Sequence, residues 1–312
     1  VLNMKILFMG TPDFAVFSLD ALCKAGEEII GVITQPDKPK GRGYALTPPP
    51  VKVYAEEKNI PVWQPNTLRG EEFAAFLEEL SPELIVVVAY GKLLPENVLK
   101  FPKYGCVNVH GSLLPEYRGA APMQRAIMEG ESETGVTVMY MAEGLDTGDI
   151  ISVEKFPIGK EDNFEDIHDK LGECGASLIV RTLDGLAEGS IERQKQDDSK
   201  ATYAAKITKD VCLVDFSRSA KEVHDLIRGL SPIPLSFTHT PDGKLLKITK
   251  SILCDGVKAG QPGEVLSIEN GITVACKNGA VTLLGVVPEG KKAMSASDFV
   301  RGRKISVGDI LK

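Results

Sequence analysis

The chain has 312 residues, of which 43% are hydrophobic and 25% charged, and it has no low-complexity tract or fixed-period repeat. These values are typical of a folded globular protein of two domains, and they exclude disordered and fibrous classes. The net charge of −7 argues against a protein that coats nucleic acid, because affinity for phosphate backbones needs clustered Lys and Arg. Residues 208–312 nevertheless carry 15 Lys and Arg against 11 Asp and Glu, a balance of +4 that leaves −11 for residues 1–207, so any RNA contact should be local.

The first apolar run covers only residues 6–9 before Gly10, Pro12 and Asp13 interrupt it. This run is too short for a signal peptide or a membrane span, so we expect a cytoplasmic protein without membrane association. The six cysteines show no C-x-x-C spacing and the four histidines are far apart, so we expect no metal centre.

The N-terminal two-thirds alternates apolar runs with amphipathic segments, which predicts an α/β fold with a Rossmann-like, mostly parallel sheet flanked by helices. The clearest strands are residues 5–9, 29–34, 84–89 and 106–110. Segment 84–89 should be central because it is apolar without alternation. Thr11 is expected to cap a helix over residues 14–25, with Pro12 in its first turn.

Residues 135–141 and 150–156 should form an antiparallel addition to the sheet, and a helix is expected over 164–186. The polar segment that follows has no apolar periodicity, so we expect a first domain over 1–189 and a linker over 190–206. Residues 207–312 contain one helix candidate and several short runs separated by Gly, Pro and Asn turns, which predicts a smaller, OB-like β-barrel domain. The helix candidate is 220–228, and the runs are 245–249, 263–268, 271–276 and 280–286.

Asn108 and His110 lie at the end of a predicted strand, on the same face because side chains alternate. The carboxyl end of a strand in an open parallel sheet faces the ligand crevice, so the two side chains are able to address one small polar group. Isolated polar residues at a strand end more often only satisfy the local backbone. Asp146, in a Gly-flanked loop between two strands, is by itself most simply a turn residue.

A longer motif joins these three residues. The stretch NVHGSLLPEYRGAAP at 108–122, with GVT at 135–137 and GLDTG at 144–148, resembles the signature of the folate-dependent formyltransferases. Further matches cover nearly the whole chain: GTPDFA at 10–15, TQPDKP at 34–39, GRG at 41–43, VVAYG at 87–91 and GKKAMS at 290–295. The resemblance is closest to the branch of that family that formylates methionine esterified to initiator tRNA.

The resemblance implies an enzyme of translation initiation that moves the formyl group of 10-formyltetrahydrofolate to the amino group of methionyl initiator tRNA. The family's catalytic Asn, His and Asp fall on Asn108, His110 and Asp146. The amine is expected to attack the formyl carbon directly, and Asn108 and His110 are expected to donate to the oxygen of the tetrahedral intermediate. Asp146 would favour the charged imidazole and assist proton movement. Neither a G-x-G-x-x-G turn nor a P-loop motif occurs, so no nucleotide cofactor is expected.

The same resemblance implies a folate site formed by residues 112–115, residues 90–94 and the loop around residues 141–146. Loops rich in Leu, Gly and Pro would provide an apolar slot and backbone hydrogen-bonding groups for the pterin. Core packing is the plain alternative for the leucines of the second segment. The candidate residues are Ser112, Leu113, Leu114 and Pro115, together with Tyr90, Gly91, Lys92 and Leu94.

The insertion at 35–50 is long for a connection between a strand and a helix, and it is basic. In the family resembled, this insertion inspects the acceptor end of the tRNA, which favours Arg42 as the contact residue, with Lys38 and Lys40 beside it. Further candidates for phosphate contacts are Lys206, Lys209, Lys291 and Lys292. Each of these basic residues has a plain alternative as a solvated surface side chain. We expect a monomer without an obligate protein partner.

Other readings remain open. Glycinamide ribonucleotide formyltransferases lack such a C-terminal domain, and formyltransferases acting on UDP-linked aminosugars share the Asn, His and Asp core. The strongest rival is the hydrolase portion of 10-formyltetrahydrofolate dehydrogenase, whose resemblance around 34–43 and 291–295 is poorer. A non-catalytic RNA-binding protein is a reading of another class, but a scaffold would not need the polar trio, and aromatic residues are few after Thr208.

Overall fold

The computed structural model describes residues 4–40, 45–254, 260–302 and 305–312. The described chain forms two compact units. The first consists of the chain up to Gly119 together with 135–156 and 168–203, and the second of 120–134, 157–167 and the chain from Ala204 onward. The domain boundaries expected from the sequence, 1–189, 190–206 and 207–312, remain predictions.

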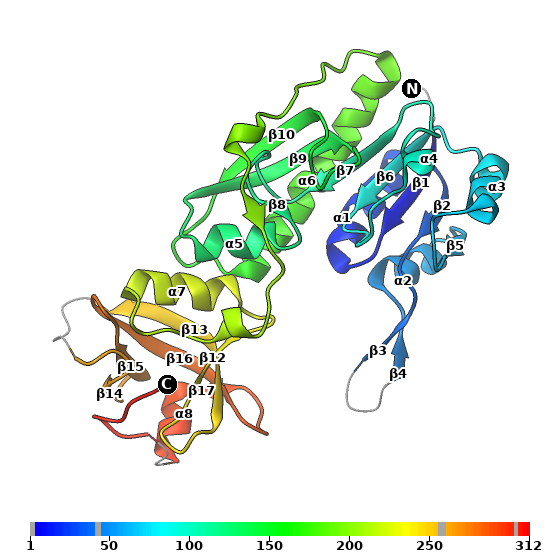
Figure 1. Ribbon diagram of the computed structural model, residues 1–312. Helices are drawn as coiled ribbons and strands as arrows, with labels where there is room; N and C mark the ends of the chain where they lie inside the picture. The colour runs from blue at the N-terminus through cyan, green and yellow to red at the C-terminus, as the bar shows by residue number, and fades with distance from the viewer. Residues whose placement is uncertain (1–3, 41–44, 255–259, 303–304) are drawn as a thin grey trace. The chain divides into compact units, whose positions relative to one another are not determined.

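A seven-stranded sheet forms the centre of the first unit, in the order β10-β9-β7-β6-β1-β2-β5 (Figure 1). The pairs from β7 through to β5 are parallel, and β9 runs antiparallel to β7. The predicted mostly parallel sheet is therefore confirmed. Its strands are β1 (Lys5–Gly10), β2 (Glu28–Ile33), β5 (Val62–Trp63), β6 (Leu84–Val88), β7 (Cys106–His110), β9 (Glu133–Tyr140) and β10 (Ile150–Pro157).

Strand β6 is central, as its sequence predicts. All five of its residues, LIVVV, are buried, which is the pattern of a strand covered on both faces. The helices of the first unit are α1 (Asp13–Ala25), α2 (Pro50–Glu57), α3 (Glu71–Leu80), α4 (Glu96–Leu99) and most of α6 (Phe164–Glu188). In the first unit, the strands and helices expected from apolar periodicity differ from the observed ones by at most two residues at either end. In the second unit the expected strand 245–249 is too short, since β13 continues to Cys254.

The turn from β1 into α1 differs from the expectation. Pro12 occupies the N-cap position and no side chain caps the helix, so the predicted cap by Thr11 is wrong. The Thr11 hydroxyl instead donates a hydrogen bond to the carbonyl of Tyr90 at 3.1 Å, which connects the ends of β1 and β6. Gly10 permits the close approach of β1 to β6 and to α1, because a Cβ there would lie 3.0 Å from the Val88 carbonyl oxygen and 2.8 Å from the Ala15 side chain.

The long insertion is not wholly irregular. It contains two short strands, β3 (Lys38–Lys40) and β4 (Ala45–Thr47), that pair in antiparallel fashion. Figure 1 shows these strands extending away from the seven-stranded sheet. The base of the insertion is held by Asp37, which accepts hydrogen bonds from Lys52 at 3.0 Å and from Gln64 at 2.8 Å.

The second unit contains a curled antiparallel sheet in the order β12-β13-β16-β15-β14, with β17 paired to β16. This half-barrel agrees with the predicted small barrel domain. Two helices, α7 (Ala220–Gly229) and α8 (Ala296–Arg301), accompany the sheet. The strands are β12 (Ser236–His239), β13 (Leu245–Cys254), β14 (Val265–Ser267), β15 (Ile272–Ala275), β16 (Ala280–Pro288) and β17 (Met294–Ser295).

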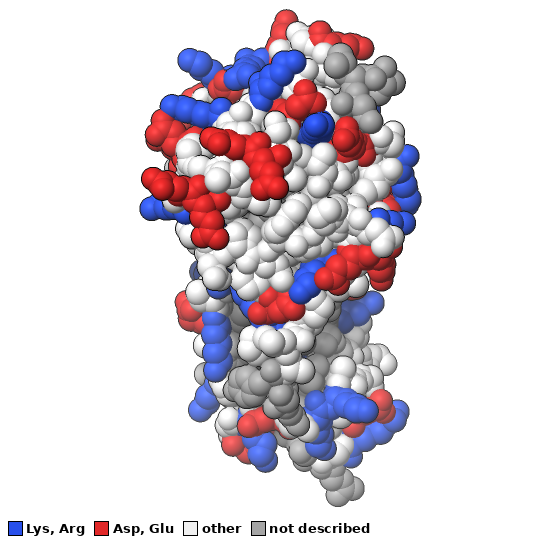
Figure 2. Space-filling view, turned by 90° about the vertical axis from the view of Figure 1, so that its right-hand side faces the viewer, with Lys and Arg blue, Asp and Glu red and all other residues white. Residues whose placement is uncertain are grey.

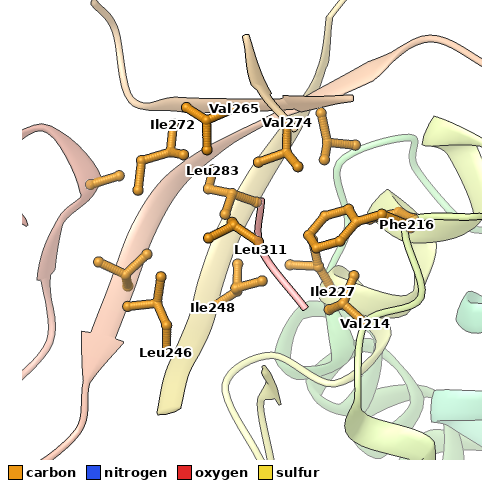
Figure 3. Close-up of a cluster of buried hydrophobic side chains, with 14 of the residues drawn as sticks. Val214, Phe216, Ile227, Leu246, Ile248, Val265, Ile272, Val274, Leu283 and Leu311 are labelled. Atoms are coloured by element: carbon orange, nitrogen blue, oxygen red, sulfur yellow. The ribbon is translucent and has the colours of Figure 1, made fainter. Parts of the chain in front are cut away.

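The core of this unit lies between the concave sheet face and α7. Figure 3 shows Leu246 and Ile248 of β13 pointing toward side chains from β14, β15 and β16, with Ile227 of α7 close by. Leu246, Ile248 and Ile227 are fully buried. Each such side chain stabilises the fold by about 1.5–3 kcal/mol relative to an exposed one. The helix begins with a capping box, in which Ser219 and Glu222 each accept a hydrogen bond from the other's backbone N–H.

A short helix, α5 (Pro122–Met128), packs against α7 within the second unit. Gly229 allows the close approach, since a Cβ there would lie 2.7 Å from the Met128 side chain and 3.1 Å from the Gln124 carbonyl.

Candidate active site

The end of β7 brings Asn108 and His110 together in the first unit. Both side chains are buried, with 9% and 6% of their surface exposed. Among the residues that the structure describes, none forms a hydrogen bond with the Asn108 side chain. Its amide donor is therefore available to a ligand, as an oxyanion donor must be.

His110 is oriented by two neighbours. Its Nε2 lies 3.0 Å from the carbonyl oxygen of Tyr117, and because a carbonyl can only accept, Nε2 carries the proton of this hydrogen bond. Its Nδ1 lies 3.7 Å from Oδ2 of Asp146. That distance is too long for a direct hydrogen bond and leaves the Nδ1 edge of the ring open to a water or a reacting group.

Asp146 is held in an unusual backbone conformation. Its φ of 53° lies in the left-handed region, which non-glycine residues seldom adopt. Its Oδ2 accepts a hydrogen bond from the backbone N–H of Gly119 at 2.7 Å. The structure thus brings the three predicted catalytic residues to one place, with the 117–119 segment in contact with both His110 and Asp146.

Two further side chains, Arg118 and Gln196, hydrogen-bond to each other beside this trio, and neither is predicted from the sequence to have a role in the site. Arg118, 2% exposed, donates from Nε and Nη2 to Oε1 of Gln196 at 3.1 and 2.8 Å. The amide nitrogen of Gln196 donates to the carbonyls of Asp146 at 2.8 Å and Gly148 at 2.7 Å. Arg118 belongs to the motif quoted above, but Gln196 lies in the polar segment expected to be a linker, where no local pattern marks it.

The segment from Ser112 to Pro115 forms a turn close to the end of β7. The Ser112 hydroxyl donates to the Glu116 carbonyl at 2.7 Å, and the Ser112 carbonyl accepts from the Thr137 hydroxyl at 2.7 Å. Leu114 packs with Met139 and Ile150 in a small buried cluster, whereas Leu113 and Pro115 are only half-buried.

The segment from Tyr90 to Leu94 contains both buried and exposed side chains. Leu94 packs in the core of the first unit, which agrees with the alternative of core packing. The adjacent Leu93 is 66% exposed. Gly91 is exposed and adopts a φ of 86°. The Lys92 ammonium donates to the Asn66 carbonyl at 3.1 Å.

Tyr90 places a polar atom in the protein interior. Its hydroxyl is buried, and no hydrogen-bond partner meets it among the described residues. Burial raises the pKa of Tyr90 to about 12, although the neighbouring Gln35 amide acts in the opposite direction. The phenol is therefore neutral across the physiological range.

The candidate tRNA contacts are surface residues where the structure describes them. Lys38 is exposed on β3, while the side chain of Lys40 and the whole of Arg42 lie outside the described residues. Lys206, Lys209, Lys291 and Lys292 are all exposed. On the face shown in Figure 2, acidic and basic side chains are interspersed, so no field of a single sign covers that face.

Over the described ranges, no group of three or more His, Cys, Asp or Glu side chains is placed to hold a metal ion. Nor does any helix in that part of the chain combine the length and apolar character that crossing a membrane requires.

Comparisons with known families agree with this architecture, in which Asn108, His110 and Asp146 lie on a mostly parallel sheet and a curled antiparallel sheet follows. Residues 4–183 match the family model described as formyl transferase, and residues 206–304 match that of the formyl transferase C-terminal domain. The chain therefore belongs to the formyl transferase family.

Comparison with curated relatives shows to which branch of the family the chain belongs. The chain is 45% identical over 307 residues to the methionyl-tRNA formyltransferase of Geobacter metallireducens, covering 98% of both chains. It is 47% identical over 309 residues to the enzyme of the same name from Bacillus subtilis, covering 98% of this chain and 97% of that one. Within the family, the chain thus belongs to the methionyl-tRNA formyltransferases.

Solved structures support the fold. The sugar 3N-formyl transferase WlaRD superposes with a TM-score of 0.66 at 22% identity, covering 94% of this chain and all of that one. HypX from Aquifex aeolicus, in complex with tetrahydrofolic acid, gives a TM-score of 0.64 at 19% identity over 96% of this chain. This chain corresponds to only 47% of the HypX chain.

Proposed function

We propose that this protein transfers the formyl group of 10-formyltetrahydrofolate to the amino group of methionyl initiator tRNA. The observation that carries the proposal is the convergence of Asn108, His110 and Asp146, with an unpaired amide and an open imidazole edge, in a chain of this family. The products are N-formylmethionyl-tRNA, used to initiate translation, and tetrahydrofolate.

The reaction begins with attack of the methionine amine on the formyl carbon. A C–N bond forms, and the carbonyl electrons move onto the oxygen to give a tetrahedral intermediate. The Asn108 amide and the Nδ1 edge of a protonated His110 donate to that oxygen. Because Nε2 already donates to the Tyr117 carbonyl, Nδ1 is the nitrogen we assign to this role.

Collapse of the intermediate breaks the bond between the formyl carbon and N10 of the folate. The attacking nitrogen loses one proton and N10 gains one. We assign this transfer to Asp146, whose Oδ2 is held by the Gly119 N–H at 2.7 Å. The 3.7 Å gap between Asp146 and His110 leaves room for a bridging water.

The folate is proposed to lie against the segments from Tyr90 to Leu94, Ser112 to Pro115 and Met141 to Asp146. Two large apolar side chains of these loops are unusually exposed, Leu93 at 66% and Leu145 at 48%. Covering them with a pterin would remove apolar surface from water, which favours binding. The buried Leu94 contributes by shaping the loop, since it belongs to the core.

The tRNA is proposed to contact the insertion through Lys38, Lys40 and Arg42, and the C-terminal region through Lys206, Lys209, Lys291 and Lys292. The exposure of the described members of this set supports the proposal. The protein is proposed to act as a monomer in the cytoplasm. A strong loss of tRNA affinity with rising salt is expected, because bound phosphates release counterions.

The test is transfer of radiolabelled formyl from 10-formyltetrahydrofolate to charged initiator tRNA, beside elongator methionyl-tRNA and a tRNA-free reaction that monitors formate release. We expect rapid transfer to the initiator alone, and its loss in His110→Ala and Asp146→Ala. Asp149→Asn is the matched control, since Asp149 lies in the same loop and only its backbone is used, accepting a hydrogen bond from Tyr140 N. Formate release without transfer would instead identify a hydrolase.

A further inference from the structure

The segment that follows α6 contributes a side chain to the candidate active site. We propose that Gln196 is a positioning residue, which holds Asp146 in its reactive orientation without touching substrate. The inference rests on the proposed function, because Asp146 is assigned its proton-transfer role there.

Gln196 holds the Asp146 loop by its backbone. Its amide nitrogen donates to the carbonyl oxygens of Asp146 at 2.8 Å and Gly148 at 2.7 Å, on either side of Thr147. Asp146 has a φ of 53°, in the left-handed region that non-glycine residues, Asp included, adopt only in a minority of cases, so the loop gains from a constraint there. The two hydrogen bonds from Gln196 supply that constraint at the residue whose carboxylate faces His110.

The orientation of the Gln196 amide is itself determined. Its oxygen accepts from Nε and Nη2 of the buried Arg118 at 3.1 and 2.8 Å, so the nitrogen must point toward the two carbonyls. Arg118 is anchored in turn, because its Nη2 donates to Asp198 at 2.7 Å and its backbone N–H to the Thr202 carbonyl at 2.9 Å. A flipped amide would place its NH₂ group against the N–H donors of Arg118 and its oxygen against the carbonyl oxygens of Asp146 and Gly148.

Gln196 therefore connects the two loops that contact the catalytic pair. One loop carries Asp146, and the other carries the Tyr117 carbonyl, which accepts from His110, and the Gly119 N–H, which donates to Asp146. Thr202 strengthens the same connection by accepting from Tyr117 N with its hydroxyl oxygen at 2.8 Å. Residues 196–202 thus support the His110–Asp146 geometry from outside.

Gln196→Glu separates the two contacts of this side chain. A carboxylate keeps the acceptor for Arg118 but replaces the amide donor with an oxygen that faces the carbonyls of Asp146 and Gly148. We expect kcat for formyl transfer to fall on the order of 10- to 100-fold, as for a small misplacement of a reacting group, with KM for the tRNA unchanged. Gln194→Glu is the matched control, since the exposed Gln194 contacts Ile150 only through its backbone.

A double-variant cycle tests whether Gln196 acts through Asp146. Single-turnover transfer is measured for wild type, Gln196→Glu, Asp146→Asn and the double variant. If the proposal is correct, Gln196→Glu has little further effect once Asp146 is replaced. The proposal is overturned if the rate loss of the double variant equals the product of the losses of the two single variants. A wild-type kcat in Gln196→Glu overturns it as well.

Thermal unfolding of the four proteins separates positioning from folding. A Gln196→Glu chain that unfolds like wild type but transfers slowly supports the proposal, whereas loss of activity in proportion to loss of folded protein contradicts it. Absence of transfer by the wild-type protein itself would refute the proposed function and is distinguishable from every outcome above.

Discussion

In the first unit, Nδ1 of His110 lies 3.7 Å from Asp146, whereas in the second unit Nε of Arg228 lies 2.7 Å from Asp225. Both pairs are largely buried, but their surroundings differ. Arg228 also donates to the Asp162 carbonyl at 2.8 Å, and Asp225 also accepts from Lys221 at 2.6 Å. Saturated hydrogen bonding is the condition for a buried ion pair to be tolerated as structure.

The His110–Asp146 pair, by contrast, is not closed by a direct hydrogen bond between Nδ1 and Oδ2. One imidazole edge faces a carboxylate across a gap that no direct hydrogen bond closes. A group that has to exchange a proton with substrate gains from such a gap, because the reacting atoms can enter it. The two pairs thus differ in a way that fits the proposed roles: one is closed by further hydrogen bonds, whereas the other is open and lies on the same strand end as the free amide of Asn108.

The strongest way to break this contrast is Asp146→Asn. The amide oxygen is still able to accept from Gly119 N–H, so the fold should be retained while the charge and the proton acceptor are lost. We expect kcat to fall on the order of 10²- to 10⁴-fold. Formyl transfer is measured beside Asp149→Asn, and equal losses in the two variants would remove Asp146 from the mechanism.

The structural pair should respond in stability rather than in chemistry. Arg228→Met leaves the buried Asp225 carboxylate with only Lys221 and removes a donor from the Asp162 carbonyl. We expect the free energy of unfolding to fall by about 3–5 kcal/mol. Urea denaturation of the full chain measures this loss.

Arg218→Met is the control for that experiment. Its side chain is 65% exposed and lies 4.0 Å from Asp215, so its removal should change stability by less than about 1 kcal/mol. Similar destabilisation by both arginine variants would show that the saturated network is not the cause.

Tyr90 is a second buried polar group that differs from the Arg228–Asp225 ion pair, because its hydroxyl has no hydrogen-bond partner among the described residues. Tyr90→Phe should stabilise the free protein by about 1 kcal/mol, since an unsatisfied buried group is removed. The folded pKa of about 12 exceeds the ordinary value of 10.0, so Tyr90 makes the wild type lose stability as pH rises from 10 toward 12. Unfolding measured across this window in both proteins checks the prediction, and a destabilised Tyr90→Phe contradicts it.

The smallest effect is expected at a partly exposed pair of the first unit, Asp13 and His168, whose Oδ1 and Nε2 are 3.5 Å apart. The hydrogen bond between them lowers the pKa of Asp13 and raises that of His168, although burial opposes both shifts. The contribution of His168 is present below its ordinary value of 6.5 and is lost as pH rises through its raised pKa, while that of Asp13 is lost as pH falls below 3.8.

His168→Gln should therefore destabilise the protein most between pH 4 and 6.5, by less than about 1 kcal/mol because solvent screens the pair. Unfolding at pH 5.5 and pH 8.5 is compared with His239→Gln, a histidine that contacts the Lys312 carbonyl instead. A larger loss at pH 8.5 than at pH 5.5 would contradict the assignment.

The sequence by itself determined most strands of the first sheet, the helices α1, α6 and α7, and the catalytic candidates. An apolar run such as LIVVV in β6 predicts burial on both faces of the strand. The alternation of side chains along β7 predicts that Asn108 and His110 share a face. These are local properties, because they depend on the period of a strand or helix. The resemblance then added Asp146, which no local pattern distinguishes from a turn residue.

Only the tertiary structure decided how these residues are held. Gly119 N and Asp146 are 27 positions apart, Gln196 and Asp146 are 50 apart, and Thr202 and Tyr117 are 85 apart. A hydrogen bond over such separations depends on how distant segments pack, and a polar segment such as 190–206 carries no periodicity that records its partners. The same reason explains why Thr11 was expected to cap α1 but bonds to Tyr90.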